Sequence, residues 1–395
     1  MNYEIPEIDK INLNNLEITL DYEEKNKCMI FRKYYDTISI EKKKIDDINY
    51  NKKWDKIKKI GNPYELVYTS LTNKRKNDNI SSYIPISRSY YKMWEVLQNF
   101  PIISKNKKNK EKIYIANLAE GPGGFMEAIY NFNKKYTNNI NYYYGITIKP
   151  YNQYVPDWNK LIKIFGNNTT VNITYGNLYK YDDVIQYINK VKNKNIKIVT
   201  ADGGFDYSAD FNGQEINSCQ IIYSEVIIAI NLLAKGGSLV CKIFDIFSLS
   251  TIYILYIIYN CFEKVSFFKP DTSRPANSEK YLICLNFLDN ISEEKKREFL
   301  LLIKRWEEMV KENDSYISLK INKIIPNEFI HSLNNFNNLY MNRQLKYLEK
   351  TFDINNGLNK EDFLKLKEEQ INIAKKWCLT YDIEINKKYS SFEDL

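Results

Sequence analysis

One glycine-rich turn constrains the fold of this chain more than any other feature of its sequence. The run Glu120-Gly121-Pro122-Gly123-Gly124-Phe125 follows an apolar stretch, 113–116, and precedes a helical pattern, 126–132. Its three glycines allow a tight turn and a close approach of the backbone to a ligand, and the free amides of the next helix suit a carboxylate or a phosphate. The turn matches neither common phosphate-binding glycine motif, so by itself it is equally typical of an ordinary strand-to-helix connection.

Strand and helix patterns alternate from residue 113 onward. Apolar runs typical of strands lie at 113–118, 142–147, 171–174, 196–201, 238–244, 265–269 and 281–287. The clearest helix between them runs from 215 to 235 and ends at Gly236-Gly237. This alternation predicts an α/β fold with a parallel, doubly wound sheet, which binds its ligands at the carboxyl ends of its strands.

The pattern changes on both sides of this region, so we expect three parts. Residues 1–60 form an N-terminal extension that is polar and shows only a short strand pattern at 16–20 and a short helix pattern at 54–60. Residues 61–290 form the α/β domain. Residues 291–395 form a helical region, in which Ser292 caps a first helix that is followed by helices at 327–349 and 360–377. This region either docks a partner or buttresses the sheet, and we expect the second.

Composition narrows the class of protein. The chain carries 57 basic and 49 acidic residues, a net charge of +8, which fits a polyanionic partner without requiring one. The six cysteines include no CxxC pair and His331 is the only histidine, so we expect reduced thiols and no metal site. The most apolar run, 252–259, is too short to cross a membrane.

Four charged residues stand where a doubly wound sheet places its active site. Asp202 follows the strand at 196–201, and Lys242 interrupts the apolar strand at 238–244. Glu279 stands at the start of the last strand, and Lys92 lies in an earlier helical stretch. Each has an ordinary alternative as a turn, strand-end or surface residue. Together, two lysines and two carboxylates can neutralise one another in a partly buried cleft, whereas a lone buried lysine could not.

This combination resembles the FtsJ-like family of S-adenosylmethionine-dependent RNA ribose 2′-O-methyltransferases. It is most similar to the mRNA cap branch, which includes members from eukaryotes and large DNA viruses. Seven blocks carry the resemblance, in the order of the family, at 62–65, 87–92, 120–125, 145–149, 201–204, 241–245 and 273–279. The resemblance implies a Rossmann-like doubly wound methyltransferase sheet, with the N-terminal extension and the C-terminal helical appendix added to it.

The resemblance also implies a role for individual residues. The family's catalytic Lys-Asp-Lys-Glu tetrad corresponds to Lys92, Asp202, Lys242 and Glu279. S-adenosylmethionine would be held by Glu120, Gly121, Pro122, Gly123, Gly124, Phe125, Thr147 and Asp202. RNA would be contacted by Arg88, Lys149, Arg274 and Asn277. The chain departs from the wider family where acids are common, having Asn117 in the first strand, Thr147 after the second and Asn177 after the third.

The chemistry of the tetrad suggests a division of roles. A ribose 2′-hydroxyl must lose a proton as it attacks the methyl carbon, so a base is needed. Burial and a nearby cation both lower the pKa of a lysine. We therefore expect Lys242 to be the base and Lys92 the nearby cation, with Asp202 and Glu279 orienting the two lysines.

The expected function is 2′-O-methylation of the first transcribed nucleotides of capped mRNA. Capped RNA is the expected partner, with capping or transcription machinery as a further one, and the oligomeric state stays open. The expected compartment is the cytoplasm, meaning host cytoplasm or virion if the chain is viral, and the nucleus is not excluded. Two alternatives remain: an FtsJ-like methyltransferase of ribosomal or transfer RNA, and a catalytically inactive RNA-binding subunit of a capping or transcription complex.

Overall fold

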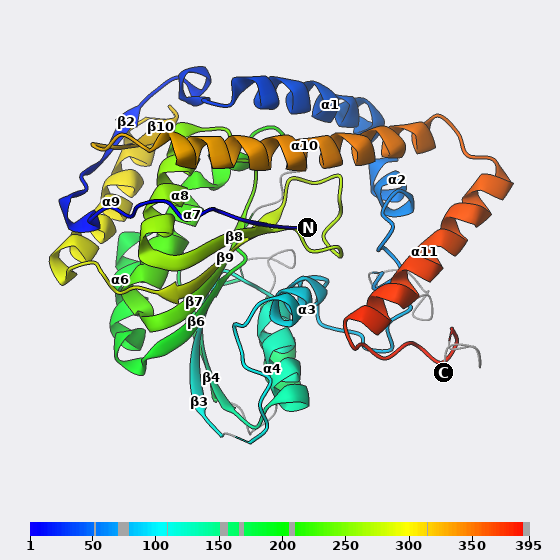
Figure 1. Ribbon diagram of the computed structural model, residues 1–395, viewed down its shortest axis with the longest axis horizontal. Helices are drawn as coiled ribbons and strands as arrows, with labels where there is room; N and C mark the ends of the chain where they lie inside the picture. The colour runs from blue at the N-terminus through cyan, green and yellow to red at the C-terminus, as the bar shows by residue number, and fades with distance from the viewer. Residues whose placement is uncertain are drawn as a thin grey trace.

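A computed structural model of the chain describes residues 1–50, 53–69, 79–108, 110–150, 157–165, 170–204, 210–313 and 315–389. Its centre is an eight-stranded sheet in the order β1-β8-β9-β7-β6-β3-β4-β5 (Figure 1). The strands are β1 (Asn2–Glu4), β3 (Lys112–Leu118), β4 (Ile140–Thr147), β5 (Thr170–Tyr175), β6 (Ile196–Ala201), β7 (Leu233–Ile243), β8 (Phe262–Phe268) and β9 (Lys280–Phe287). The predicted α/β sheet is confirmed, and all seven predicted strands are present.

The prediction that the sheet is wholly parallel is wrong for its β9 end. Strands β5, β4, β3, β6 and β7 pair in parallel. Strand β9 runs antiparallel to both β7 and β8, and β1 runs antiparallel to β8. The cause is the connection between β8 and β9, which contains no helix, because a parallel neighbour needs a longer crossover.

Helices cover both faces of the sheet. One face carries α6 (Tyr181–Val191), α7 (Gln214–Leu232) and α8 (Leu249–Cys261), and the other carries α3 (Ser89–Asn99), α4 (Gly124–Tyr136) and α5 (Asn159–Phe165). The strand residues alternate between two apolar cores, as in β3, where Ile115 joins the α3/α4 side and Ala116 joins the α7/α8 side. Helix α7 is buried over nearly its whole length because α9 (Glu293–Glu312) packs outside it.

Segments from before and after the main sheet meet on the α7/α8 side. Strand β2 (Ile18–Tyr22) pairs antiparallel with β10 (Ile317–Ile321), and α1 (Arg32–Tyr50) lies alongside α10 (Asn327–Asn355), as Figure 1 shows. The remaining helices are α2 (Trp54–Ile60) and α11 (Lys360–Thr380), and Ser292 caps α9 as predicted. Helix α1 was not predicted. The division of the chain into three parts stays a prediction.

None of the helices in the described residues is long and apolar enough to cross a bilayer.

Helix α7 ends earlier than the sequence pattern predicts. It ends at Leu232, and residues 233–235 already belong to β7. The glycines expected to end the helix therefore lie inside the strand segment, where Gly236 has a φ of +77°.

Candidate active site

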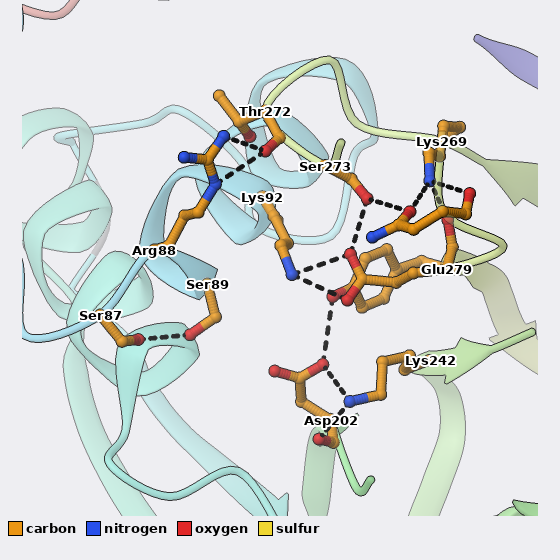
Figure 2. Close-up of polar contacts among 12 residues, drawn as sticks. Ser87, Arg88, Ser89, Lys92, Asp202, Lys242, Lys269, Thr272, Ser273 and Glu279 are labelled. Atoms are coloured by element: carbon orange, nitrogen blue, oxygen red, sulfur yellow. Dashed lines mark hydrogen bonds and ion pairs between the residues drawn. The ribbon is translucent and has the colours of Figure 1, made fainter. Parts of the chain in front are cut away.

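The four tetrad residues form two ion pairs at one edge of the sheet (Figure 2). Lys92 Nζ lies 2.8 Å from Glu279 Oε1, and it donates to Glu279 Oε2 at 2.8 Å as well. Lys242 Nζ lies 3.2 Å from Asp202 Oδ1 and donates to the main-chain oxygen of Asp202 at 2.8 Å. The hydroxyl of Tyr281 donates to Asp202 Oδ1 at 3.1 Å. The structure thus pairs each predicted lysine with one predicted carboxylate.

The direction of β9 explains why these residues meet. Asp202 follows the carboxyl end of β6, and Lys242 lies next to the carboxyl end of β7. Because β9 is antiparallel, its first residues lie beside the last residues of β7, with Lys242 opposite Tyr281. Glu279, which directly precedes β9, therefore lies at the active edge. A parallel strand would have placed it at the opposite edge.

The charges of the tetrad are held in a mostly buried cluster. The four side chains are between 11% and 14% exposed. Burial raises the pKa of Glu279, but Lys92, Lys242 and Lys269 outweigh it and hold that pKa well below its usual value. Burial lowers the pKa of Lys242, but Asp202, Glu279 and Glu225 outweigh it, so the net shift is upward. The expectation that the pKa of Lys242 is lowered is wrong in this structure, because three carboxylates oppose the effect of burial.

Two residues that the sequence analysis did not single out fix the position of Glu279. Ser273 Oγ donates to Glu279 Oε1 at 2.7 Å. Lys269 is buried at the end of β8, and it donates to the main-chain oxygens of Glu279 at 2.6 Å and Asn277 at 3.0 Å. Burial holds the pKa of Lys269 well below its usual value. The sequence signal that could have identified Lys269 is a lysine within an apolar strand pattern, which is also what singled out Lys242.

The glycine turn joins β3 to α4 as predicted, and its glycines have packing roles. Gly123 caps α4 with a φ of +103°, a conformation that side chains rarely adopt. A Cβ on Gly124 would lie 2.2 Å from Ser89 Oγ of α3, so only glycine lets the two helices approach this closely. Phe125 is fully buried against Tyr281, with ring centroids 5.6 Å apart. Gly121 and Pro122 complete the turn, and both are partly exposed.

The buried polar atoms next to the turn fit the amino-acid end of S-adenosylmethionine. Thr200 Oγ1 accepts from Asn117 Nδ2 at 2.7 Å and donates to Glu120 Oε2 at 3.0 Å. Within the described residues, Asn117 Oδ1 and Glu120 Oε1 are buried acceptors without a hydrogen-bond partner. Acceptors of this kind suit an ammonium group. Thr147 ends β4 at the same edge of the sheet and is buried.

The four residues predicted to contact RNA have different surroundings. Arg88 and Arg274 both reach Glu65, with Arg88 Nη1 and Arg274 Nε lying 3.1 and 3.4 Å from Glu65 Oε2. Arg88 also donates to the main-chain oxygens of Tyr68 and Thr272, each at 3.0 Å. Asn277 binds Lys269, whereas Lys149 is exposed after β4. Lys149 is exposed, and the Arg274 side chain is 28% exposed against 20% for that of Arg88.

A second lysine network lies behind the tetrad. Asp245 Oδ2 lies 2.9 Å from Lys42 Nζ of α1, and Asp245 Oδ1 lies 3.4 Å from Lys280 Nζ of β9. Lys280 also donates to the main-chain oxygen of Phe244 at 2.6 Å. Asp245 ends the family block at 241–245, and no role was predicted for it. Lys42 was missed because it is some 200 positions away from its partner.

Comparison with known proteins identifies the family of this chain. A family model for FtsJ-like methyltransferases matches residues 85–287, just over half of the chain. This chain belongs to the FtsJ-like methyltransferase family. All four tetrad residues and the glycine turn of this FtsJ-like chain lie inside the matched region, whereas Glu65, α1, α10 and α11 lie outside it.

Several relatives of this FtsJ-like chain are cap methyltransferases by name. The cap-specific mRNA (nucleoside-2′-O-)-methyltransferase 1 of Dictyostelium discoideum is 31% identical over 320 residues, covering 73% of this chain and 39% of the relative. The proteins of the same name from Mus musculus and Xenopus laevis are 30% and 28% identical, covering 60% and 58% of this chain and 29% and 27% of the relatives. The chain thus spans well under half the length of these curated relatives.

Proposed function

We propose that this chain transfers a methyl group from S-adenosylmethionine to a ribose 2′-hydroxyl of capped mRNA, at the first transcribed nucleotides. The observation that carries the proposal is the pairing of Lys92 with Glu279 and of Lys242 with Asp202 at the carboxyl edge of the sheet. Membership of the FtsJ-like family and the names of the relatives support the reaction and the RNA class.

The cosubstrate would be held by the residues around the glycine turn. S-adenosylmethionine, when bound, supplies a methyl group on a positively charged sulfur. Glu120 and Asn117 offer unpaired buried acceptors to its ammonium group, and the start of α4 offers amides to its carboxylate. Asp202 would offer a negative charge to the sulfonium. Thr147 lies at the end of β4 for the ribose end of the molecule.

Lys242 would take the proton from the 2′-hydroxyl. In the structure its ammonium is bound by Asp202 through both a carboxylate and a main-chain oxygen, and the net shift of its pKa is upward. A cation beside Asp202 would share its negative charge and lower the pKa of Lys242, which would favour the role of Lys242 as a base.

Glu279 and Asp202 would orient the two lysines. Glu279 accepts from Lys92 on one side and from Ser273 on the other, so both of its oxygens are fixed. The Tyr281 hydroxyl fixes Asp202 in the same way. Holding both lysines before RNA binds reduces the reorganisation that the reaction requires.

Arg274 and Lys149 are the residues that we propose for RNA phosphates, because both are cations and both are more exposed than Arg88. Arg88 would act on RNA indirectly, through Thr272 and Glu65. Two further predictions belong to this proposal. The chain divides into three parts, at 60/61 and 290/291, and it acts in the cytoplasm. The six cysteines are buried and free, which agrees with a reducing compartment.

The test is methyl transfer from labelled S-adenosylmethionine to a short capped RNA and to the same RNA without a cap. Label confined to the first nucleotides of the capped RNA is the expected result. Equal label in both RNAs would favour a methyltransferase of ribosomal or transfer RNA. If neither RNA is labelled by folded protein, calorimetry with S-adenosylmethionine distinguishes a binding subunit, which would show no heat of binding, from an enzyme with a different substrate.

A further inference from the structure

The loop between β8 and β9 is held by α3 at a residue that the proposed mechanism does not use. Glu95 lies one helical turn after Lys92 and is fully buried. Its Oε2 accepts from the amide of Asp271 at 2.7 Å, and its Oε1 accepts from the amide and the hydroxyl of Thr272 at 2.8 and 2.7 Å. One carboxylate thus fixes two successive residues of the loop.

Arg88, one turn before Lys92, holds the same point of the loop from the other side. Its Nε and Nη2 donate to the main-chain oxygen of Thr272 at 3.3 and 3.0 Å (Figure 2). Thr272 therefore has its amide, its hydroxyl and its carbonyl bound by a single helix. The helix that grips Thr272 is the one that carries the catalytic Lys92.

The hydrogen bonds that hold Thr272 continue through Ser273 to the carboxylate of Glu279. Ser273 follows Thr272 and donates to Glu279 Oε1 at 2.7 Å, and Glu279 in turn binds Lys92. Figure 2 shows this path from Thr272 through Ser273 to Glu279 and Lys92. A displacement of Thr272 would move Ser273 and change the orientation of Glu279. Misplacing reacting groups by about 1 Å can cost roughly a hundredfold in rate.

A fourth donor to Glu95 comes from the C-terminal helix. Trp377 Nε1 of α11 donates to Glu95 Oε1 at 3.1 Å. Trp377 is 3% exposed and packs edge-on against Tyr91, with ring centroids 5.4 Å apart. Figure 1 shows α11 running from beyond the end of α10 to the neighbourhood of α3. Only Ala374, Trp377 and Cys378 of α11 are buried, so this helix is anchored at the end nearest the site.

Helix α11 also contacts the segment that supports Glu65. Gln370 Nε2 donates to the main-chain oxygens of Lys59, Ile60 and Asn62 at 3.0, 3.0 and 2.7 Å. Asn62 Nδ2 donates to Glu65 Oε2 at 2.8 Å, and Glu65 binds both Arg88 and Arg274. Helix α11 therefore contacts the supports of both the loop and the arginine pair.

We infer that Glu95 is a positioning residue for methyl transfer and that Trp377 sets its orientation, so α11 belongs to the catalytic machinery. The inference rests on the proposed function, because it concerns the rate of that reaction. Glu95 faces four donors, which a carboxylate can accept and a glutamine cannot, since a glutamine would turn its own amide hydrogens toward some of them. A role in packing alone would leave the rate of transfer per folded molecule unchanged.

The test uses the full chain and four variants: W377F, E95Q, the double variant and W306F as a matched control. W377F removes the indole donor and keeps an aromatic ring against Tyr91. W306F makes the same change at a buried tryptophan of α9 that packs against Tyr223 on the other side of the sheet. We expect W377F to lower kcat about tenfold and E95Q about a hundredfold, with the KM for S-adenosylmethionine unchanged. The double variant should equal E95Q, because both changes act through one contact.

Hydrogen exchange supplies a readout that does not depend on turnover. The amides of Asp271 and Thr272 should exchange faster in W377F than in wild type and W306F. A W377F kcat equal to that of W306F, or losses that multiply in the double variant, would overturn the inference. If E95Q does not fold, the comparison of W377F with W306F decides alone. An inactive wild type would instead show failure of the proposed function, and that outcome is visible before any variant is compared.

Discussion

The tetrad and the Lys42–Asp245–Lys280 network use the same residue types at the same edge of the sheet, yet they are built differently. In the tetrad each lysine has its own carboxylate, and the side chains are 11% to 14% exposed. In the second network two lysines share one carboxylate, and the side chains are 1% to 8% exposed. In the register of β7 and β9, Lys242 lies opposite Tyr281 and Lys280 lies opposite Ile243, so the two lysines point to opposite faces.

The pKa shifts of the two lysines go in opposite directions. Carboxylates outweigh the burial of Lys242, and its pKa is raised. Burial dominates at Lys280, where Asp245 opposes it and Lys42 adds to it, and the pKa of Lys280 is lowered to about 8. The comparison teaches that a buried lysine near an acid is not by itself a catalytic base. Two features distinguish the tetrad from the network that joins α1 to the sheet. The tetrad side chains are more exposed to solvent, and each tetrad lysine has its own carboxylate.

Replacing Lys242 should give the largest effect on activity. We expect K242A to lower kcat by about a thousandfold, the range of a lost general base, while calorimetry shows cosubstrate binding within a few-fold of wild type. Its loss of stability should be smaller than that of D245N below, because Asp202 is more exposed than Asp245 and keeps the Tyr281 hydroxyl. Substantial turnover by K242A would remove the distinction between the two networks.

Replacing Asp245 should give the largest effect on stability. D245N leaves Lys42 and Lys280 buried without a carboxylate, which costs about 3–5 kcal/mol in the free energy of unfolding. K42M is the matched control, because it leaves a neutral Asp245–Lys280 pair, and we expect a loss of only about 1 kcal/mol. Urea denaturation of both variants measures the two values. Equal losses would mean that the network stabilises through the contacts of α1 and not through charge.

A smaller effect should appear in the dependence of stability on pH. The pKa of Lys280 is lowered to about 8 in the fold from a usual value of 10.5, so between these values the unfolded chain binds the proton that the folded chain has lost. Stability from this group therefore rises as the pH increases through that window, by about 3 kcal/mol. Denaturation of wild type and K280M between pH 8 and pH 10.5 tests this. The unfolding free energy of the wild type minus that of K280M should increase with pH. A difference that stays constant would contradict the lowered pKa of Lys280.

The strands and the tetrad could be predicted from the sequence because their signals are local. The apolar run at 196–201 is β6 without change, and Asp202 follows it as expected. The antiparallel direction of β9 could have been predicted, because no helix lies between residues 269 and 280. The alternation of strands and helices in the rest of the domain favoured a parallel sheet instead. Helix α1 was missed although Ile38, Ile45 and Ile48 recur at helical spacing and are buried, because charged residues are abundant between them.

The electrostatics of the site lay beyond the sequence for a different reason. The upward shift at Lys242 depends on Asp202, Glu279 and Glu225, which come from three separate segments. The links from Lys42 to Asp245 and from Trp377 to Glu95 join positions more than 200 residues apart. Such contacts depend on tertiary packing, and no spacing within the chain indicates them.

The most direct test of the central claim is single-turnover methyl transfer by the wild-type chain to two capped RNAs that differ at one atom. One RNA has ribose at the first transcribed nucleotide, and the other has 2′-deoxyribose there. Transfer to the first RNA and none to that nucleotide of the second is the predicted result. Equal transfer to the first nucleotide of both RNAs would contradict the claim, because the methyl group would then be going to an atom other than the 2′-oxygen.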